Sequence, residues 1–277
     1  MVRLKNMLLS LLSLGSIACS GQNGNGMETY DIRSTKTYIE AGGRRIYTEM
    51  NIPKCDGPMP LLIYSHGYGY NWEMVPLADI ARHGIVTVFF DFPGGSPGSR
   101  SGGSSTEMSV MTEADDLELV LDYMRQFPQV DTSRVFLCGG SQGGFVSAVT
   151  GIRRQHDVAG LILCCPALVI MDFEQAYNHG KRVESRFRFG NMTVSDRYVR
   201  DLDGYDAYAE MAKFAGPVLI YHGDRDSMVP LSYSERAAKA FPNARLRILR
   251  GASHMLWIGN EAQIEREITT FIHTQAK

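Results

Sequence analysis

The chain has 277 residues, of which 44% are hydrophobic, and its 28 basic and 30 acidic residues give a formal net charge of −2. This length and apolar content suit one domain with a substantial buried core. Because the charges are scattered without runs, the sequence offers no basic patch of the kind that binds nucleic acid or an anionic membrane surface. We therefore expect a small-molecule or saccharide partner and no nucleic acid, while the oligomeric state stays open.

The first residues have the pattern of a secretory signal. Arg3 and Lys5 precede an apolar stretch, residues 7–17, which is followed by small residues. This stretch is shorter than the roughly 20 residues that cross a bilayer as a helix. We therefore expect residues 1–26 to be a signal segment whose last part, 21–26 (GQNGNG), is a flexible tether.

The end of this segment also resembles a bacterial lipoprotein box. In residues 16–19 (SIAC), Cys19 would become the lipidated N-terminus, although Ser16 stands where leucine is usual. A plain cleaved signal peptide and a chain start at Met27 are the alternatives. The expected location is the periplasm, or the membrane of a bacterium through a lipid on Cys19.

The other cysteines are Cys55, Cys138, Cys164 and Cys165, and they show neither the spacing of a disulfide framework nor a C-x-x-C metal motif. Three of them lie in or beside apolar runs, where small core residues are expected. We expect no metal and no cofactor.

After residue 30, short apolar runs alternate with longer amphipathic stretches, as in strands joined by crossover helices. The unbroken runs that we expect to be buried parallel strands are 61–64, 86–90, 135–138, 161–164 and 218–221, with 246–249 following. Residues 107–126 have helical spacing, and 36–52 alternate as an antiparallel hairpin at the sheet edge. The prediction is one α/β domain, 27–277, with a mostly parallel central sheet and helices on both faces.

One segment, residues 166–215, interrupts this alternation and is too long for an ordinary connection. It is rich in aromatic residues: Phe173, Tyr177, Phe187, Phe189, Tyr198, Tyr205 and Tyr208. It also contains Arg182, Arg186, Arg188, Arg197 and Arg200. We interpret it as an inserted lid.

The strand that ends at Cys138 leads into Gly139-Gly140-Ser141-Gln142-Gly143-Gly144 and then into a helical stretch. This is the G-x-S-x-G pattern in its strand-turn-helix context, which presents the serine hydroxyl at a helix N-terminus. The alternative is a glycine-rich turn or a phosphate loop. The pattern predicts that Ser141 is a nucleophile.

A serine hydroxyl is a poor nucleophile without an imidazole to take its proton and a carboxylate to orient that imidazole. Residues 222–230 (HGDRDSMVP) follow one expected strand, and His254 follows the last one. We expect His254 to be the base and Asp226 the acid that orients it. Asp224 is the competing acid, and either aspartate could instead cap the helix that follows.

Acyl transfer also needs hydrogen-bond donors for the developing oxyanion. The amide after the nucleophile, that of Gln142, is one expected donor. The second is the amide of Tyr68, in the loop His66-Gly67-Tyr68-Gly69 that follows the strand 61–64. A tight turn without a catalytic role is the alternative for these glycines.

From about Tyr47 to its end, the chain resembles bacterial cinnamoyl and feruloyl esterases of the α/β-hydrolase superfamily. The resemblance is carried by His66-Gly67, residues 90–95 (FDFPGG), residues 106–110 (TEMSV), the Ser-Gln-Gly-Gly of the elbow and the lid after Cys164-Cys165-Pro166. It implies an α/β-hydrolase fold, hydrolysis of hydroxycinnamoyl esters, and a contact from Asp172 to the ring hydroxyl of the acyl group.

Three other functions stay open. Ser-Gln-Gly-Gly also resembles acetyl esterases that act on decorated xylan, and the same triad serves serine aminopeptidases of this fold. The arginines of the lid depart from the esterase pattern and would favour an acidic acyl or sugar group. An exported binding lipoprotein that has lost turnover is the remaining alternative.

Overall fold

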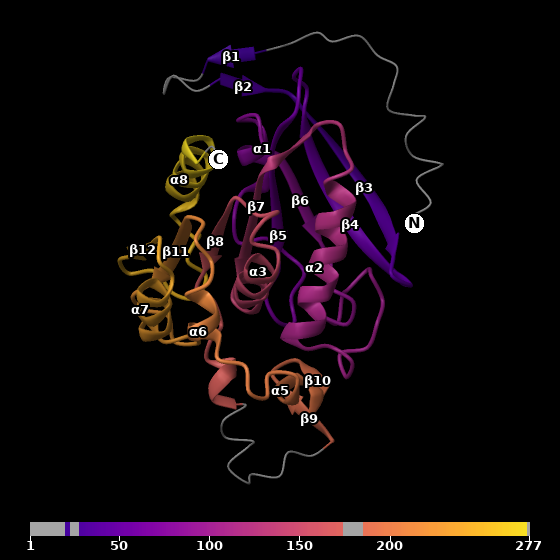
Figure 1. The fold of residues 1–277 in the computed structure, drawn as a ribbon, viewed down its shortest axis with the longest axis vertical. Helices are drawn as coiled ribbons and strands as arrows, with labels where there is room; N and C mark the ends of the chain where they lie inside the picture. Colours follow the sequence, from indigo (N-terminus) through magenta and orange to yellow (C-terminus); the bar gives the residue numbers. More distant parts are fainter. Residues whose placement is uncertain (1–19, 23–27, 174–184, 276–277) are drawn as a thin grey trace.

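The central element of the fold is an eight-stranded sheet of order β12-β11-β8-β7-β5-β6-β4-β3 (Figure 1). The computed structural model describes residues 20–22, 28–173 and 185–275. The strands are β3 (Ile32–Ala41), β4 (Arg44–Pro53), β5 (Met59–Ser65), β6 (Val86–Phe90), β7 (Val130–Gly140), β8 (Gly160–Cys164), β11 (Val218–Gly223) and β12 (Ala244–Leu249). Pairing is parallel from β6 through β12 and antiparallel where β4 meets β3 and β6. The predicted mostly parallel sheet is confirmed.

Helices cover both faces of this sheet. They are α1 (Leu77–Ala81), α2 (Val110–Met124), α3 (Gln142–Arg153), α7 (Leu231–Ala240) and α8 (Glu261–Thr274). Successive residues of β5 point to opposite faces, so Leu61 joins the core formed with α2, α3 and α7, whereas Leu62 joins the core formed with α1 and α8. Burial on both faces explains why the parallel strands are unbroken apolar runs.

The helix α2 begins three residues later than the predicted start at 107. The Ser109 side chain accepts a hydrogen bond from the Thr112 amide, and the Thr112 hydroxyl accepts one from the Ser109 amide. This capping box satisfies two backbone amides that the first turn would otherwise leave unpaired. The capping box therefore determines the residue at which α2 begins, within a longer stretch of helical apolar spacing.

The lid leaves the sheet after β8 and returns at β11. Its described part contains the antiparallel hairpin β9 (Arg186–Phe189) and β10 (Met192–Ser195), followed by α5 (Arg197–Arg200) and α6 (Ala207–Met211). Figure 1 shows β9, β10 and α5 together at the end of the molecule opposite β1 and β2. Side chains of β10 and α5, including Val194 and Tyr198, are buried in the same core as α2 and α3.

Most of the residues on which the N-terminal prediction rests lie outside the described part of the chain. These residues include Cys19 and the apolar stretch 7–17. A short strand β1 (Ser20–Gln22) pairs antiparallel with β2 (Glu28–Tyr30). Two residues that the sequence placed in a tether, Gly21 and Gln22, therefore belong to a strand. Among the described residues, no helix combines the length and the apolar character that a membrane crossing requires.

Candidate active site

Ser141 occupies the sharp turn between the end of β7 and the start of α3. Its φ of 53° and ψ of −120° lie outside the regions that non-glycine residues favour, a conformation that costs of order 1–3 kcal/mol. The Ser141 amide donates to the Cys164 carbonyl at 2.8 Å, and the Ser141 carbonyl accepts from the Ala167 amide at 2.9 Å. The end of β8 and the start of the lid therefore hold the strained turn in place.

Glycine is required beside Ser141 because the backbone of α3 passes very close to its neighbours. A Cβ atom at Gly143 would lie 2.1 Å from the Ser65 carbonyl oxygen, and one at Gly139 would lie 2.1 Å from the Gly143 carbonyl oxygen. A side chain at Gly143 would push α3 away from β5, and one at Gly139 would push α3 away from the end of β7. The glycines of the motif thus place the first turn of α3 directly against the sheet.

Asp226 and His254 come together from the loops after β11 and β12. His254 Nδ1 lies 2.7 Å from Asp226 Oδ2, while Asp226 Oδ1 accepts the amides of Met228 at 2.8 Å and Val229 at 2.9 Å. Burial alone would raise the pKa of Asp226, but the hydrogen bonds from His254 and the two amides outweigh it and lower the pKa. The ionised carboxylate thereby fixes His254 with its proton on Nδ1 and leaves Nε2 for chemistry.

The competing acid, Asp224, has a different partner. Its exposed carboxylate accepts a hydrogen bond from the Gly251 amide at 2.6 Å. This contact ties the loop after β11 to the loop that leads to His254. The structure therefore pairs Asp226 with the imidazole and gives Asp224 a supporting contact.

A second histidine, His222, is buried against Asp226 and was assigned no part in the site from the sequence. Its Nε2 lies 2.9 Å from the Val229 carbonyl and 3.4 Å from Asp226 Oδ2, and its Nδ1 lies 2.7 Å from the Ser234 hydroxyl. Burial lowers the pKa of His222, so the ring is neutral and, with a proton on Nε2, donates to the Val229 carbonyl. Its position at the end of β11 was the only signal in the sequence.

Cys165 joins the three loops that carry Ser141, Asp226 and His254. It has a φ of 40°, and its thiol donates to the His254 carbonyl at 3.6 Å. The Ser141 amide donates to the carbonyl of the preceding residue, Cys164, at 2.8 Å, and burial raises the pKa of the Cys165 thiol well above its ordinary value. The adjacent residues Cys164 and Cys165 therefore contact both the turn of Ser141 and the loop of His254.

The same sulfur belongs to a compact group of possible metal ligands. Cys165 Sγ, a carboxylate oxygen of Asp226 and a ring nitrogen of His254 all lie within 4.8 Å of one another. The hydrogen bond between Asp226 and His254 orients the imidazole as a general base, a role that needs no metal. The expectation that no metal or cofactor takes part stays a prediction.

The two expected oxyanion residues flank Ser141. Gln142 is the first residue of α3, a position whose amide has no intrahelical acceptor. The loop with Tyr68 lies on the other side, since a Cβ at Gly67 would be 3.2 Å from the Ser141 Cβ. The side chain of Tyr68 turns to the lid, where its hydroxyl donates to the Phe189 carbonyl at 2.6 Å.

Two residues that the sequence analysis missed hold the Gln142 side chain. Its Nε2 donates to Glu113 Oε2 at 2.7 Å, and its Oε1 accepts from the Tyr198 hydroxyl at 2.6 Å. Burial raises the pKa of Glu113 to about 8, although the hydrogen bond from Gln142 opposes this rise. Neither residue belongs to a motif, and they lie 29 and 56 positions from Gln142 in the chain.

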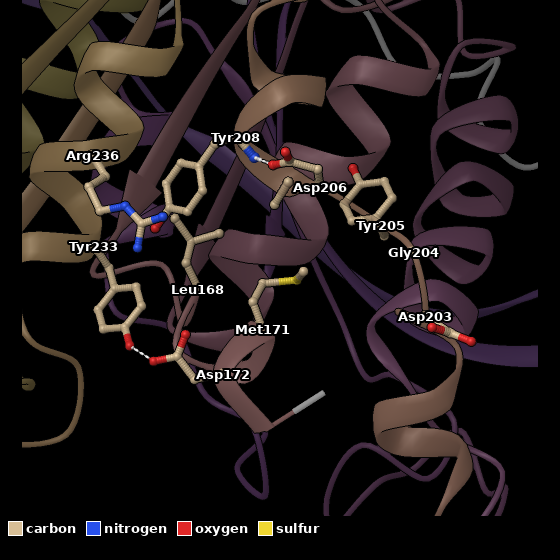
Figure 2. A pocket seen from close by; sticks show the side chains of 11 residues that line it. Leu168, Met171, Asp172, Asp203, Gly204, Tyr205, Asp206, Tyr208, Tyr233 and Arg236 are labelled. Carbon is tan, nitrogen blue, oxygen red and sulfur yellow. Dashed lines mark hydrogen bonds between the residues drawn. The ribbon is translucent and has the colours of Figure 1, made fainter. Parts of the chain in front are cut away.

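The remaining expected site residue, Asp172, lines a cavity of about 530 Å³ (Figure 2). Its carboxylate accepts a hydrogen bond from the Tyr233 hydroxyl, and the Arg236 guanidinium lies 4.1 Å above the Tyr208 ring. The described residues around the cavity are Leu168, Met171, Asp172, residues 203–208, Tyr233 and Arg236, and they do not include Ser141, Asp226 or His254. A contact from Asp172 to substrate stays a prediction.

Two of the lid arginines have partners within their own helix region. Arg197 pairs with Asp201 at 2.8 Å, and Arg200 pairs with Asp196 at 2.9 Å. These pairs offset two of the five arginine charges of the lid, those of Arg197 and Arg200. Tyr177 and Arg182 lie outside the described residues.

The sequence is similar to those of known hydrolases and related enzymes. The sequence model of the prolyl oligopeptidase family matches residues 68–277. The chain belongs to the prolyl oligopeptidase family. Two curated relatives align with only part of it: the non-heme chloroperoxidase CPO-A1 of Kitasatospora aureofaciens, 34% identical over 77 residues, and the putative carbamate hydrolase RutD of Pseudomonas savastanoi pv. phaseolicola, 30% identical over 79 residues. These alignments cover 26% and 28% of this chain, and 28% and 30% of the relatives.

Solved structures match over most of the prolyl oligopeptidase-family chain. Est1E from Butyrivibrio proteoclasticus, solved with ferulic acid bound, has a TM-score of 0.77 at 22% identity over 86% of this chain and 98% of its own. A predicted CIB-like hydrolase from Thermoplasma acidophilum has a TM-score of 0.63 at 19% identity over 88% and 100%. The solved structures show that the protein has the α/β-hydrolase fold, whereas the curated relatives align over less than a third of their own length.

Proposed function

We propose that this serine hydrolase cleaves carboxylic esters, with hydroxycinnamoyl esters as its substrates, through an acyl-enzyme formed on Ser141. The observation that carries the proposal is the 2.7 Å hydrogen bond between His254 and the buried carboxylate of Asp226. The loop of His254 contacts Cys165, and the turn of Ser141 contacts Cys164 beside it. A strained serine, an oriented imidazole and a fixed carboxylate supply the nucleophile, base and acid of ester hydrolysis.

In the first half-reaction, His254 Nε2 takes the proton of Ser141 while Oγ attacks the ester carbonyl. The amides of Gln142 and Tyr68 stabilise the resulting oxyanion, and one such donor typically contributes about 2.7–4 kcal/mol. Collapse of the intermediate breaks the bond to the alcohol, which leaves with the proton from His254. Water, deprotonated by the same imidazole, then attacks the acyl-enzyme and releases the acid and free Ser141.

The hydroxycinnamoyl preference rests on aromatic side chains beside the expected oxyanion loop. The Tyr68 ring packs at 5.0 Å from Phe189 and 5.6 Å from Tyr198, and Phe173 lies 5.4 Å from Phe189, all between ring centroids. A wall of edge-to-face rings is complementary to a flat aromatic acyl group. The ferulic acid in the similar Est1E structure supports this choice of substrate.

A peptidase is the second candidate, because the family is named for oligopeptidases. The triad chemistry is the same for an ester and an amide, so the fold does not separate the two. Cleavage of acetyl groups from decorated xylan is a third possibility that needs no aromatic contact. A binding protein without turnover is disfavoured by the intact pair of His254 and Asp226.

Steady-state hydrolysis of methyl ferulate, p-nitrophenyl acetate and an aminoacyl anilide tests the proposal. The wild type is compared with Ser141→Ala and with Ser147→Ala, a matched control in α3 whose buried hydroxyl has no partner among the described residues. We expect ferulate to have the highest kcat/KM and only Ser141→Ala to abolish it. Dominant anilide cleavage would make the protein a peptidase, and cleavage of acetate alone would make it a deacetylase.

A further inference from the structure

Tyr198 of the lid contacts both residues whose amides are the expected oxyanion donors. Its hydroxyl donates to Gln142 Oε1 at 2.6 Å, and its ring centroid lies 5.6 Å from that of Tyr68. The side chain is buried in the core that α5 shares with α2 and α3. One tyrosine from the lid therefore touches the donor loops on both sides of Ser141.

Glu113 of α2 completes the contact from the opposite side of Gln142. The Gln142 carboxamide has its oxygen on the Tyr198 hydroxyl and its nitrogen on Glu113 Oε2, and all three side chains are about 1% exposed. Because a buried polar group without a partner costs about 1–3 kcal/mol, the carboxamide is restricted to an orientation that satisfies both ends. That orientation also fixes the first residue of α3, which carries the oxyanion amide.

We propose that Tyr198 and Glu113 are positioning residues that hold the oxyanion amides of Gln142 and Tyr68 in place, Tyr198 from the lid and Glu113 from α2. This inference rests on the proposed esterase function, because it assigns the hydrogen-bonded chain Tyr198–Gln142–Glu113 to the same site. The lid then acts on turnover as well as on substrate binding. An insert folded away from the elbow would leave Gln142 held by Glu113 alone.

The groups around Glu113 support a neutral hydrogen-bonding role. Burial is the main cause that raises its pKa to about 8; the hydrogen bond from Gln142 opposes this rise, and the nearby Asp116 carboxylate adds to it. Tyr198 of the lid and Tyr68 of the loop after β5 interact electrostatically with Glu113, and burial raises the pKa of Tyr198 well above its ordinary value. Near pH 7, neutral Glu113 and neutral Tyr198 therefore hold the Gln142 carboxamide. Neither of them adds a negative charge that would repel the oxyanion.

The test uses Tyr198→Phe, Glu113→Ala and Glu113→Gln in the full chain, with kcat and KM for p-nitrophenyl acetate measured per active site. Active sites are counted with a fluorophosphonate, whose adduct reports Ser141 independently of the acyl group. Matched controls are Tyr221→Phe, which removes a buried hydroxyl that donates to Glu267 at 3.1 Å, and Asp116→Asn, which changes the neighbouring buried carboxyl of α2. Thermal unfolding confirms that each variant is folded at the assay temperature.

We expect Tyr198→Phe and Glu113→Ala to lower kcat roughly 5- to 30-fold with KM within twofold. This loss is smaller than the roughly 10²–10³ that follows removal of an oxyanion donor. Glu113→Gln should recover most of the kcat, since its amide oxygen still accepts from Gln142, and the double variant Tyr198→Phe/Glu113→Ala should lose less than the product of the single losses.

The inference would be overturned by a kcat within twofold of the wild type in Tyr198→Phe and Glu113→Ala, or by losses equal to those of Tyr221→Phe and Asp116→Asn. A change confined to KM would assign these residues to substrate binding and overturn it as well. Failure of the proposed function is distinguishable from failure of this inference alone. If the proposed function fails, the wild type will neither hydrolyse esters nor react with the fluorophosphonate at Ser141, and both proposals will be wrong.

Discussion

The buried carboxyl of Glu113 makes the stability of the fold depend on pH in a way that one substitution should remove. Its pKa is raised from 4.5 to about 8, chiefly by burial, so the folded state binds this proton more tightly than the unfolded state does. The corresponding stability is fully present below pH 4.5 and is lost as pH rises through about 8. Each pKa unit corresponds to about 1.4 kcal/mol, which makes the loss about 5 kcal/mol.

Glu113→Gln removes this titration and keeps an acceptor for Gln142. Urea unfolding at pH 5 and pH 9 should therefore show a free energy of unfolding that falls by about 2–5 kcal/mol more in the wild type than in the variant. Asp116, whose pKa burial raises to about 7 despite its bond to Arg44, titrates in both proteins, so the difference between them reports the Glu113 carboxyl and its interaction with Asp116. Parallel pH dependences in the two proteins would refute the assignment of a buried, neutral Glu113.

Three further predictions concern the triad, the elbow and the N-terminus. Asp226→Asn should lower kcat about 10⁴-fold, whereas Asp224→Asn should stay within a few fold in the same ester assay; equal losses would contradict the pairing with His254. Gly143→Ala should destabilise the protein by several kcal/mol in urea unfolding, because its Cβ would lie 2.1 Å from the Ser65 carbonyl oxygen, and wild-type stability would refute this close approach. We propose that the protein is exported, so mass spectrometry of the mature chain from a bacterial host should find the signal segment removed; a lipid on Cys19 would identify a lipoprotein, and an unprocessed N-terminus would contradict export.

Most of the sheet could be predicted because its buried parallel strands appear in the sequence as unbroken apolar runs. Runs such as 61–64 and 218–221 are apolar at every position, since helices cover both faces of β5 and β11. The turn at Ser141 could also be predicted, because the backbone approaches so closely at Gly139 and Gly143 that only glycine fits, and these glycines form a recognisable motif. Both signals are local, and each is imposed by the backbone or by burial on residues adjacent in the chain.

The parts that escaped prediction depend on contacts between distant segments. Glu113 and Tyr198 reach Gln142 only through the packing of α2 and the lid on α3, and neither carries a spacing that marks it. His222 had a position at a strand end but no pattern that separated packing from contact with Asp226. Long-range hydrogen bonds of this kind are selected by geometry and leave no periodicity to detect.

The central claim is that Ser141 is the nucleophile of an ester hydrolase. The most direct test is to react the wild type with a fluorophosphonate and to locate the adduct by peptide mass spectrometry, with loss of methyl ferulate hydrolysis followed in the same sample. We predict one adduct, on Ser141, formed in step with the loss of activity. An adduct on another residue, or full labelling with activity intact, would contradict the account.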